Sequence, residues 1–536
     1  STCKVSLKRF IVNGFDFYYE NGCCALALIK SRFGKFSLSH TQTLRTNSSV
    51  EFDAFDIIMS IVLRLRNIHS HVLTEDTKLR RGLQHHFSYV HPKFYALKKK
   101  VEGGTVQVNK LPHYRWAGFV NVFDSKSGRF PTGLIADVKT FLISNNVDWE
   151  EQDERGFKGT YPEPDVVTPD ILSTKENPLT LRDYQVQVAN LALQERRGII
   201  KCATGGGKTL MFTAILKALK NQYQTVVLTR SISLLDQTFE VFEKAGIQNI
   251  GRVGGKHFNP TLITCSTIQS LHKLSKELIK NTQVLIVDEV HQFASKESAK
   301  WMKMFKNASI RLGFSATPWK ADDPLHNWQV KSWLGPELCD ISTFELKSVK
   351  VLSESTAHFY KIDCSIIPKY LPWIEAEEFG IVQNEPFHEK VAAIVNAVPE
   401  GRILVLVKRI AHGDALQALI PDAYWVKGED SAETRDYVFS QLRETDKKKV
   451  VAIISPIGFL GINVYVHHLV NACGGKEASL LIQKVGRGLR RASDKDELHY
   501  HDFIFEHNPY LEEHSLYRIE TLKSEGHPVV IEEDGK

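Results

Sequence analysis

The stretch Ala203–Thr209, with the sequence ATGGGKT, decides the fold class of this 536-residue chain. It follows the apolar run Gly198–Ile200 and opens a helical pattern that extends from Leu210 to Leu219. A strand, a glycine loop and a helix N-terminus form a phosphate cradle, because backbone N–H groups and the helix dipole point at the anion. In such a loop the lysine reaches the terminal phosphates and the threonine hydroxyl binds Mg²⁺. The first glycine of the usual spacing is replaced by Cys202.

A second motif follows an apolar run of strand length, Val284–Val287, which ends in Asp288-Glu289-Val290-His291. Buried parallel strands have this pattern, and ligands bind at their carboxyl ends. We therefore expect Asp288 to hold Mg²⁺ and Glu289 to orient or deprotonate the attacking water. The alternative is a charged strand-to-helix loop, which the phosphate cradle upstream disfavours.

A third motif, Gln483–Arg491 (QKVGRGLRR), places Arg487 and Arg490 three residues apart, on one face if the segment is helical. Planar guanidinium groups suit the charge that spreads over a transferring phosphoryl group. A basic surface helix or a phosphate-backbone contact would have the same composition. Because both nucleotide motifs are present, we favour a role for these arginines in ATP hydrolysis.

In this order the segments resemble the motifs of superfamily 2 helicases and translocases, over about residues 175–505. Ala203–Thr209 resembles motif I, and Asp288–His291 is a DEVH variant of motif II. Ser315–Thr317 resembles motif III, and Gln483–Arg490 resembles motif VI. Further matches are Leu181–Gln185 (adenine recognition), Val226–Gln237 (motif Ia), Thr264–Gln269 (nucleic-acid backbone contact), Arg402–Gly413 (motif IV) and Ser455–Asn463 (motif V). In motif V Asn463 stands where an acidic residue is common, which leaves its coupling role open.

The resemblance implies ATP and Mg²⁺ as cofactors and assigns roles to individual residues. Catalysis falls to Lys208, Asp288, Glu289, Arg487 and Arg490, and metal binding to Thr209 and Asp288. The nucleotide would contact Arg182, Gln185, Thr204, Gly205, Gly206, Gly207, Lys208, Thr209, Gly461 and Gln483. Coupling falls to His291, Ser315 and Thr317, although a structural role at a strand end suits Ser315 and Thr317 equally well. Within the motor, the nucleic-acid contacts would be Arg230, Lys256, Ser266 and Thr267.

The region before the motor resembles the small domain that precedes the motor in phage branch-migration helicases. The likeness lies in three short elements, His91–Phe94 (HPKF), Arg115–Gly118 (RWAG) and Arg129–Leu134 (RFPTGL). It implies an ATP-driven DNA motor that remodels branched DNA by fork regression, branch migration or unwinding, in recombination, repair or replication.

Positive charge concentrates in the same region. Residues 61–140 hold fourteen Lys or Arg against five Asp or Glu, whereas the whole chain has 68 against 62. Its cluster Lys98, Lys99 and Lys100 lies among aromatic residues that include Trp116. A basic module with aromatic side chains is typical of a nucleic-acid binder, although most charge runs are only solvated surface.

The sequence predicts an α/β fold with two RecA-like parallel-sheet lobes after a small basic α+β domain. The expected domains are an N-terminal region (1–147), a linker (148–178), lobe 1 with motifs I–III (179–335), an inter-lobe connection (336–380), and lobe 2 with motifs IV–VI and a C-terminal helix (381–536). No apolar run approaches the length of a membrane span, and the eight cysteines form no C-x-x-C pair. We therefore expect a monomeric cytoplasmic protein, in the host cytoplasm if viral, without a membrane, zinc or disulfide framework.

Three functions remain open from the sequence. The first is a motor acting on branched or forked DNA, single- or double-stranded, or on duplex DNA without branch preference. The second is an RNA-directed helicase, because the motor motifs do not distinguish DNA from RNA. The third is a binding module whose ATPase has decayed, which the intact set of catalytic residues disfavours.

Overall fold

The computed structural model describes residues 8–12, 15–19, 61–90, 94, 119–156, 161–162, 165–220, 222–320, 323–443, 448–455, 465–491 and 495–532. The chain divides into two compact units, residues 1–58 and 59–536. In the first unit β1 (Lys8–Val12) pairs antiparallel with β2 (Phe15–Tyr19). Among the described residues, no helix has the length and apolar character that crossing a membrane requires.

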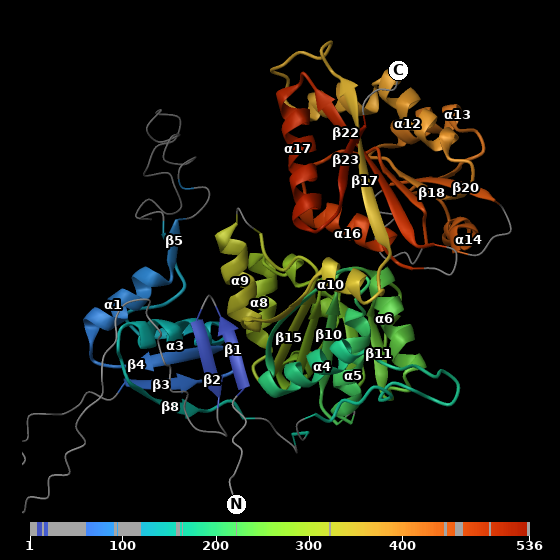
Figure 1. The fold of residues 1–536 in the computed structure, drawn as a ribbon. Helices are drawn as coiled ribbons and strands as arrows, with labels where there is room; N and C mark the ends of the chain where they lie inside the picture. Colours follow the sequence, from blue (N-terminus) through green and yellow to red (C-terminus); the bar gives the residue numbers. More distant parts are fainter. Residues whose placement is uncertain are drawn as a thin grey trace, which may run out of the picture. The chain divides into compact units, whose positions relative to one another are not determined.

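The second unit begins with the α+β domain that the sequence predicts (Figure 1, blue and cyan). Its sheet has the order β7-β4-β3-β8, and the pair β3–β8 is parallel while the other pairs are antiparallel. The strands are β3 (Ile61–Leu65), β4 (His69–Leu73), β7 (Arg129–Pro131) and β8 (Trp149–Asp153). The helices are α1 (Thr77–His86), η2 (Thr132–Leu134) and α3 (Ile135–Ser144), and β5 (Ser88–Val90) pairs with β6 (Phe119–Asn121).

The expected linker begins later than predicted. Residues 149–153 form β8, which pairs with β3 from Ile61 to Leu65 and completes the domain's sheet. The prediction of a linker from residue 148 was wrong at this end. The side chains of the edge strand WEEQD are mostly exposed, so its charged sequence lacks the apolar pattern by which strands are predicted.

Lobe 1 is built on an eight-stranded sheet of order β12-β11-β13-β10-β14-β15-β9-β16, parallel except for β12. Its strands are β9 (Arg197–Cys202), β10 (Thr225–Thr229), β11 (Ile250–Gly254), β12 (His257–Phe258), β13 (Ile263–Thr267), β14 (Val284–Asp288), β15 (Ile310–Ser315) and β16 (Glu337–Ile341). Its helices are α4 (Asp183–Glu195), α5 (Lys208–Ala218), α6 (Ile232–Lys244), η3 (Ile268–Lys273), α7 (Lys276–Asn281), η4 (Val290–Gln292), α8 (Lys296–Met304), α9 (Pro324–Leu334) and α10 (Thr343–Ser348). Strands β10, β13 and β14 are buried along their whole length, as is typical of parallel strands covered on both faces.

The register of this sheet gathers the candidate motifs at one edge. Thr229 lies opposite Thr267, Asp288 opposite Phe314, and Ser315 opposite Lys201. Because the strands are parallel, motif I, motif II and motif III all leave the sheet at its carboxyl edge, where open α/β sheets bind their ligands.

Lobe 2 is a seven-stranded sheet of order β19-β20-β18-β21-β22-β17-β23, in which every adjacent pair is parallel (Figure 1, yellow to red). Its strands are β17 (Glu354–Asp363), β18 (Gly401–Leu406), β19 (Tyr424–Val426), β20 (Lys449–Ile454), β21 (His468–Asn471), β22 (Glu497–Glu506) and β23 (Val529–Glu532). Its helices are α11 (Trp373–Glu377), η5 (Glu378–Val382), α12 (Glu385–Ala397), α13 (Ile410–Leu419), α14 (Ala432–Arg443), α16 (Ala478–Gly488) and α17 (Pro509–Ser524). These elements confirm the predicted α/β fold class, and α17 includes the predicted C-terminal helix.

Two parts of the expected inter-lobe connection, residues 336–380, belong to the two sheets, and its end lies in α11 and η5 of lobe 2. Residues 337–341 are the edge strand β16 of lobe 1, and residues 354–363 are the strand β17 of lobe 2. The stretch that joins the sheets is therefore residues 342–353, and the prediction was too long because both strands lack a continuous apolar run.

Candidate functional site

The glycine loop has the backbone that a phosphate cradle requires. Gly205 and Gly207 adopt φ angles of +91° and +82°, which favour glycine. A Cβ atom at Gly206 would lie 2.5 Å from Cys202 Sγ, and one at Gly207 would lie 2.2 Å from Gln185 Nε2. Lys208 is the first residue of α5, and its Nζ donates a hydrogen bond of 3.2 Å to the Cys202 carbonyl oxygen. Each glycine is thus fixed by conformation or by close packing.

Two side chains from α4 hold the loop in place. Gln185 Nε2 donates to the Gly206 carbonyl at 3.1 Å, and the Tyr184 hydroxyl donates to the same oxygen at 2.8 Å. Gln185 Oε1 accepts from the backbone N–H of Arg182, so the amide also caps its own helix. Gln185 is fully buried against motif I and Arg182 is exposed, and their roles in nucleotide binding stay predictions. The sequence analysis did not identify Tyr184 as a functional residue, although it belongs to the same Leu181–Gln185 segment.

The motif II carboxylates lie at the carboxyl end of β14. Asp288 is buried, and burial together with the adjacent Glu289 raises its pKa to about 7, while Lys208 opposes that shift. Glu289 adopts a left-handed backbone with φ +54°, and its N–H donates to Asp288 Oδ1 at 3.0 Å. This turn directs the two carboxylates of consecutive residues into one site.

Motif III meets motif II through a serine. The buried Ser315 hydroxyl lies 2.9 Å from His291 Nδ1 and 3.3 Å from Glu289 Oε2, and it accepts from the Thr317 N–H at 3.1 Å. Burial lowers the pKa of His291, whereas Glu289 raises it. His326 Nε2 lies 2.7 Å from the His291 carbonyl oxygen, and no sequence motif predicts this contact because His326 lies on α9, 35 residues further along the chain. The Thr317 hydroxyl oxygen is buried and has no hydrogen-bond partner among the described residues.

Motif VI reaches this site from α16. Gln483 Nε2 lies 3.4 Å from His291 Nε2, and a Cβ atom at Gly486 would lie 2.5 Å from the Thr204 Cβ. Burial, followed by the charge of Arg490, lowers the pKa of Arg487 to about 10, and Glu289 and Asp288 oppose this shift. The Arg487 guanidinium therefore lies within the field of the motif II carboxylates.

Arg490 lies beyond the end of the motif VI helix. Helix α16 ends at Gly488, and Arg490 forms an isolated antiparallel bridge with Leu352. Burial lowers its pKa and Tyr465 raises it, and its side chain lies beside the glycine loop, because a Cβ atom at Gly205 would be 4.0 Å from Arg490 Cγ. The helix stops between Arg487 and Arg490, so the condition for one shared helical face is not met, and the role of Arg490 in ATP hydrolysis stays a prediction.

The site fits a nucleoside triphosphate with Mg²⁺. The cradle is closed to any side chain larger than glycine, it opens the eleven-residue helix α5, and the Thr204 hydroxyl beside it is buried without a hydrogen-bond partner among the described residues. Two adjacent carboxylates, one with a strongly raised pKa, are the ligands that a divalent cation would neutralise. Thr209 and Asp288 would bind Mg²⁺, which would supply positive charge to the phosphate oxygens.

The nucleic-acid contacts predicted in lobe 1 divide into two classes. Arg230 follows β10 and is partly exposed, and Lys256 is exposed in the β11–β12 turn. Ser266 is fully buried and its hydroxyl donates to the Thr267 carbonyl at 3.0 Å, while the buried Thr267 hydroxyl lies 3.0 Å from Ser270 Oγ. The predicted backbone contact of Ser266 was therefore wrong, because its side chain points into the lobe. The predictions for Lys98, Lys99, Lys100, Trp116, Gly461 and Asn463 lie outside the described residues.

Comparison with known proteins supports this geometry. Residues 178–320 match the family described as "Type III restriction enzyme, res subunit". The chain carries a superfamily 2 helicase motor. It is 23% identical to the ATP-dependent DNA helicase uvsW of Enterobacteria phage T4, over 77% of this chain and 90% of the phage protein. It is 27% identical to the DNA 3'-5' translocase XPB2 of Sulfurisphaera tokodaii, over 40% of this chain and 44% of that protein.

A solved structure shows the same fold. The fragment of a putative HsdR subunit of a type I restriction enzyme from Vibrio vulnificus YJ016 aligns with a TM-score of 0.51 at 18% identity, covering 68% of this chain and 70% of that one. The helicase motor is therefore an ATP-hydrolysing enzyme acting on nucleic acid, as the motifs predicted.

Proposed function

We propose that this protein is an ATP-dependent DNA helicase or translocase that remodels branched DNA. The observation that carries the proposal is the convergence of Lys208, Asp288, Glu289 and Arg487, from three motifs, on one glycine-loop site. The similarity to a phage DNA helicase along most of both chains supports DNA as the substrate.

The residues of the site divide the work of hydrolysis. Lys208 binds the β- and γ-phosphates, and Glu289 holds and deprotonates the attacking water. Arg487 stabilises the charge on the transferring phosphoryl group. Hydrolysis releases the γ-phosphate that Lys208 and Arg487 both contact, and the equilibrium between two arrangements of the motor shifts. The Glu289–Ser315–His291 network passes this change to motif III.

Preference for branches requires a second DNA contact beside the motor. The basic region 61–140, with nine more cationic than anionic side chains, supports this part of the proposal. Two linked DNA-binding surfaces raise the effective local concentration on a substrate with two arms, so a branched molecule gains avidity that a linear duplex does not. Because phosphate contacts release counterions, the preference should weaken as salt concentration rises.

The test is ATPase activity and unwinding by the full chain on a four-way junction, a fork, a linear duplex, single-stranded DNA and RNA. We expect the junction and the fork to stimulate ATP hydrolysis most. Equal stimulation by all DNA forms would reject branch preference, and stimulation by RNA alone would reject DNA.

A charge variant tests the source of the preference. Replacing Lys98, Lys99 and Lys100 together by Ala should reduce the junction-to-duplex ratio. The matched control replaces Lys273, Lys276 and Lys280, which lie in or next to α7, by Ala and should leave that ratio unchanged.

A further inference from the structure

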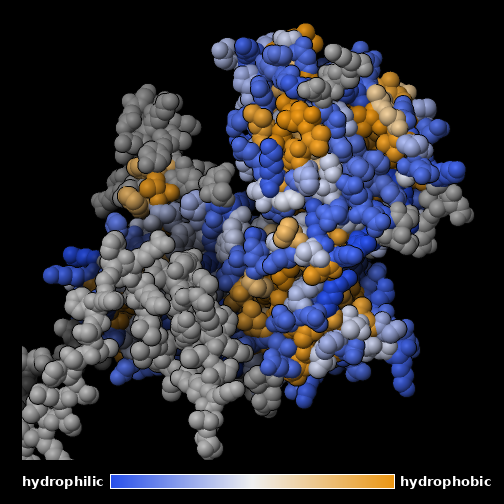
Figure 2. Space-filling view, viewed as in Figure 1, coloured by the Kyte–Doolittle hydropathy of each residue, from blue (hydrophilic) through white to orange (hydrophobic). Residues whose placement is uncertain are grey.

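The segment after β17 carries a group of exposed apolar and aromatic side chains. Tyr370 is 97% exposed and Ile366 is 88% exposed, and Trp373, Ile374 and Phe379 are about half exposed. In the space-filling view, apolar residues lie among hydrophilic ones on the surface of lobe 2 (Figure 2). We call Ile366, Tyr370, Trp373, Ile374 and Phe379 the aromatic segment.

Buried neighbours anchor this segment to lobe 2. Cys364, Ile367, Ala376 and Ile381 alternate with the exposed residues and belong to the lobe 2 core. A Cβ atom at Gly380 would lie 2.3 Å from Leu511 Cδ1, so the segment packs tightly on α17. The exposed rings are therefore presented by a fixed backbone, which lowers the entropy that a ligand would have to remove on binding.

Cationic side chains accompany the rings. Lys408 Nζ lies 5.5 Å from the centre of the Trp373 ring and forms an ion pair with Glu377. Arg409, which is exposed, pairs with Glu378 at 3.5 Å. Both cations beside the rings are therefore paired with carboxylates of the protein itself, Lys408 with Glu377 and Arg409 with Glu378.

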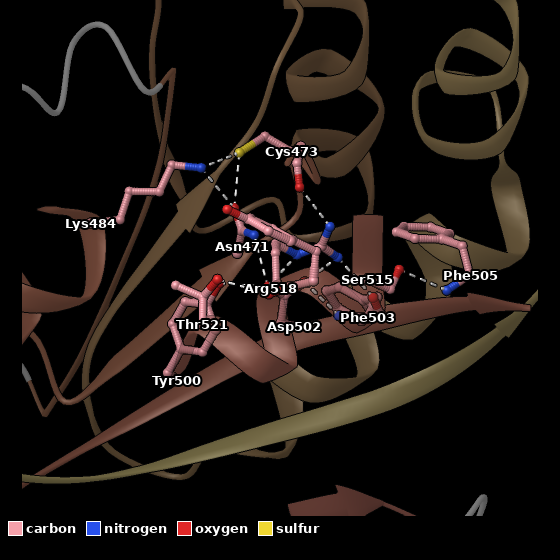
Figure 3. Close-up of polar contacts among 12 residues, drawn as sticks. Asn471, Cys473, Lys484, Tyr500, Asp502, Phe503, Phe505, Ser515, Arg518 and Thr521 are labelled. Atoms are coloured by element: carbon pink, nitrogen blue, oxygen red, sulfur yellow. Dashed lines mark hydrogen bonds and ion pairs between the residues drawn. The ribbon is translucent and has the colours of Figure 1, made fainter. Parts of the chain in front are cut away.

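Lys408 also joins the aromatic segment to a basic cavity. The cavity has a volume of about 210 Å³, and its charged lining consists of Lys408, Lys476, Lys484 and Arg518 with the single carboxylate Glu477. Lys484 Nζ points to Asn471 Oδ1 at 3.0 Å and to Cys473 Sγ at 2.9 Å (Figure 3). Lys408 pairs with Glu377, Lys476 with Glu513 and Arg518 with Asp502, while the partners of Lys484 named above carry no carboxylate.

The topology places all these groups at one edge. Lys408 follows β18, residues 472–477 follow β21, and the aromatic segment follows β17. These strands are parallel, so the three segments emerge at the carboxyl edge of the lobe 2 sheet. Strand β18 has β20 on one side and β21 on the other, which is a topological switch point where α/β sheets bind ligands.

We infer that the aromatic segment binds unpaired bases of a nucleic acid strand. Phosphates of the same strand bind at the cavity that Lys408 and Lys484 line. Surfaces that bind single strands combine aromatic side chains for base stacking with a cationic track for the backbone, and every base offers a π-face. The inference rests on the proposed function, since it gives the motor a place to hold the strand that it separates. In a duplex the bases stack on each other, so Tyr370 and Trp373 distinguish an opened strand from a closed one.

Photocrosslinking tests the contact in the unmodified full chain. Single-stranded DNA carrying 5-iodouracil is bound without ATP and irradiated, and crosslinked peptides are identified by mass spectrometry. We expect the crosslinks on the peptide with Tyr370 and Trp373, reduced by competing single-stranded DNA or RNA and much less by blunt duplex. Crosslinks confined to other peptides would overturn the inference.

Substitutions measure the strength of the contact. Tyr370→Ala and Trp373→Ala should each weaken binding of single-stranded DNA about 5- to 150-fold, the range for one aromatic–base stack, and duplex binding much less. Tyr370→Phe keeps the ring and should bind like the original chain. Tyr437→Ala, an exposed aromatic on α14, is the matched control and should not change affinity.

Binding is measured without ATP, so its outcome is independent of the ATPase assays that test the proposed function. Unchanged affinity in both alanine variants would overturn the inference and leave the exposed apolar group as a candidate protein contact. Loss of affinity in Tyr370→Phe as well as Tyr370→Ala would overturn stacking in favour of a hydroxyl contact.

Discussion

The Ser315 hydroxyl lies 2.9 Å from His291 Nδ1 and 3.3 Å from the Glu289 carboxylate, so one side chain connects motif II to motif III. The hydroxyl is fully buried and also accepts from the Thr317 N–H. A change in the charge or position of Glu289 during hydrolysis should therefore alter the hydrogen bonds of Ser315 at the end of β15, where the chain leaves the sheet of lobe 1.

Ser315→Ala should separate hydrolysis from movement. The substitution leaves Lys208 and Arg487 in place and keeps the direct 3.4 Å contact between His291 Nδ1 and Glu289 Oε2, but it removes the hydroxyl that connects both residues to motif III. We expect the number of base pairs unwound per ATP hydrolysed to fall at least several-fold more than the ATPase rate falls. ATPase and unwinding assays on one forked substrate provide the ratio, and an equal decline in both activities would contradict a coupling role.

Glu289→Gln should leave ATP bound but slow to react. The amide keeps the shape and a hydrogen-bond acceptor but cannot take a proton from water. Loss of a general base typically costs about 10²- to 10⁴-fold in rate, so kcat should fall in that range while nucleotide affinity changes little. Single-turnover hydrolysis together with equilibrium binding of a fluorescent ATP analogue measures both quantities, and normal hydrolysis would exclude Glu289 as the base.

Arg487 and Arg490 should differ in effect. Arg487 lies in the field of Asp288 and Glu289, whereas Arg490 lies near Tyr465, bridges to Leu352 and places its Cγ beside Gly205. Arg487→Ala should lower kcat by about 10³- to 10⁵-fold with little change in ATP affinity, as for an arginine finger. Arg490→Ala should have the smaller effect on kcat. Steady-state kinetics with saturating DNA measures kcat and KM of both variants. An equal loss of kcat in both would show that the two arginines contribute equally to hydrolysis, as the sequence predicts.

The motifs were predictable from sequence because their geometry is local or set by strand order. A glycine loop between a buried strand and a helix can form few structures, and parallel strands bring Asp288 and Ser315 to the same edge as Lys208. The fold class followed from the same alternation of apolar strands and helices.

The remaining features depend on tertiary packing that no local pattern encodes. Tyr184 and Gln185 both donate to the Gly206 carbonyl, which requires the end of α4 to lie against the loop. The burial of Ser266 depends on its place in a fully buried strand, β13. Helix α16 stops before Arg490 because that residue pairs with Leu352, far away in the sequence.

Arg518→Met should destabilise lobe 2 strongly. The Arg518 guanidinium makes two hydrogen bonds of 2.9 Å to the buried Asp502 carboxylate, which also accepts from Tyr500 and Asn471 (Figure 3). Removing one partner of a buried pair leaves an uncompensated charge and costs about 3–5 kcal/mol in the free energy of unfolding. Asp502→Asn added to Arg518→Met should recover part of the loss. Urea unfolding of the three proteins is the measurement, and a single variant as stable as the original chain would contradict the argument.

Acid should destabilise the protein through His412, which is fully buried in lobe 2. Both ring nitrogens lack a hydrogen-bond partner among the described residues, and the ring stacks on His388. Burial, with a smaller contribution from His388, lowers the pKa of His412 to about 3, from an ordinary value of 6.5. At a pH between about 3 and 6.5, His412 is therefore protonated in the unfolded chain and neutral in the folded chain. Stability is complete above pH 6.5 and falls as the pH drops towards 3, by about 2 kcal/mol at pH 5 from this residue.

His412→Leu should remove that contribution. The leucine keeps an apolar side chain beside Phe387 and has no group to protonate, so the difference in unfolding free energy between pH 7 and pH 5 should shrink by about 2 kcal/mol. His527 is buried and His468 is partly buried, and burial lowers their pKa values to about 3 and about 4, so part of the acid sensitivity should persist. Denaturant unfolding at both pH values measures the difference, and His257→Asn, an exposed histidine on β12, is the control that should leave it unchanged. An identical pH dependence in His412→Leu and the original chain would show that this histidine takes up no proton on unfolding.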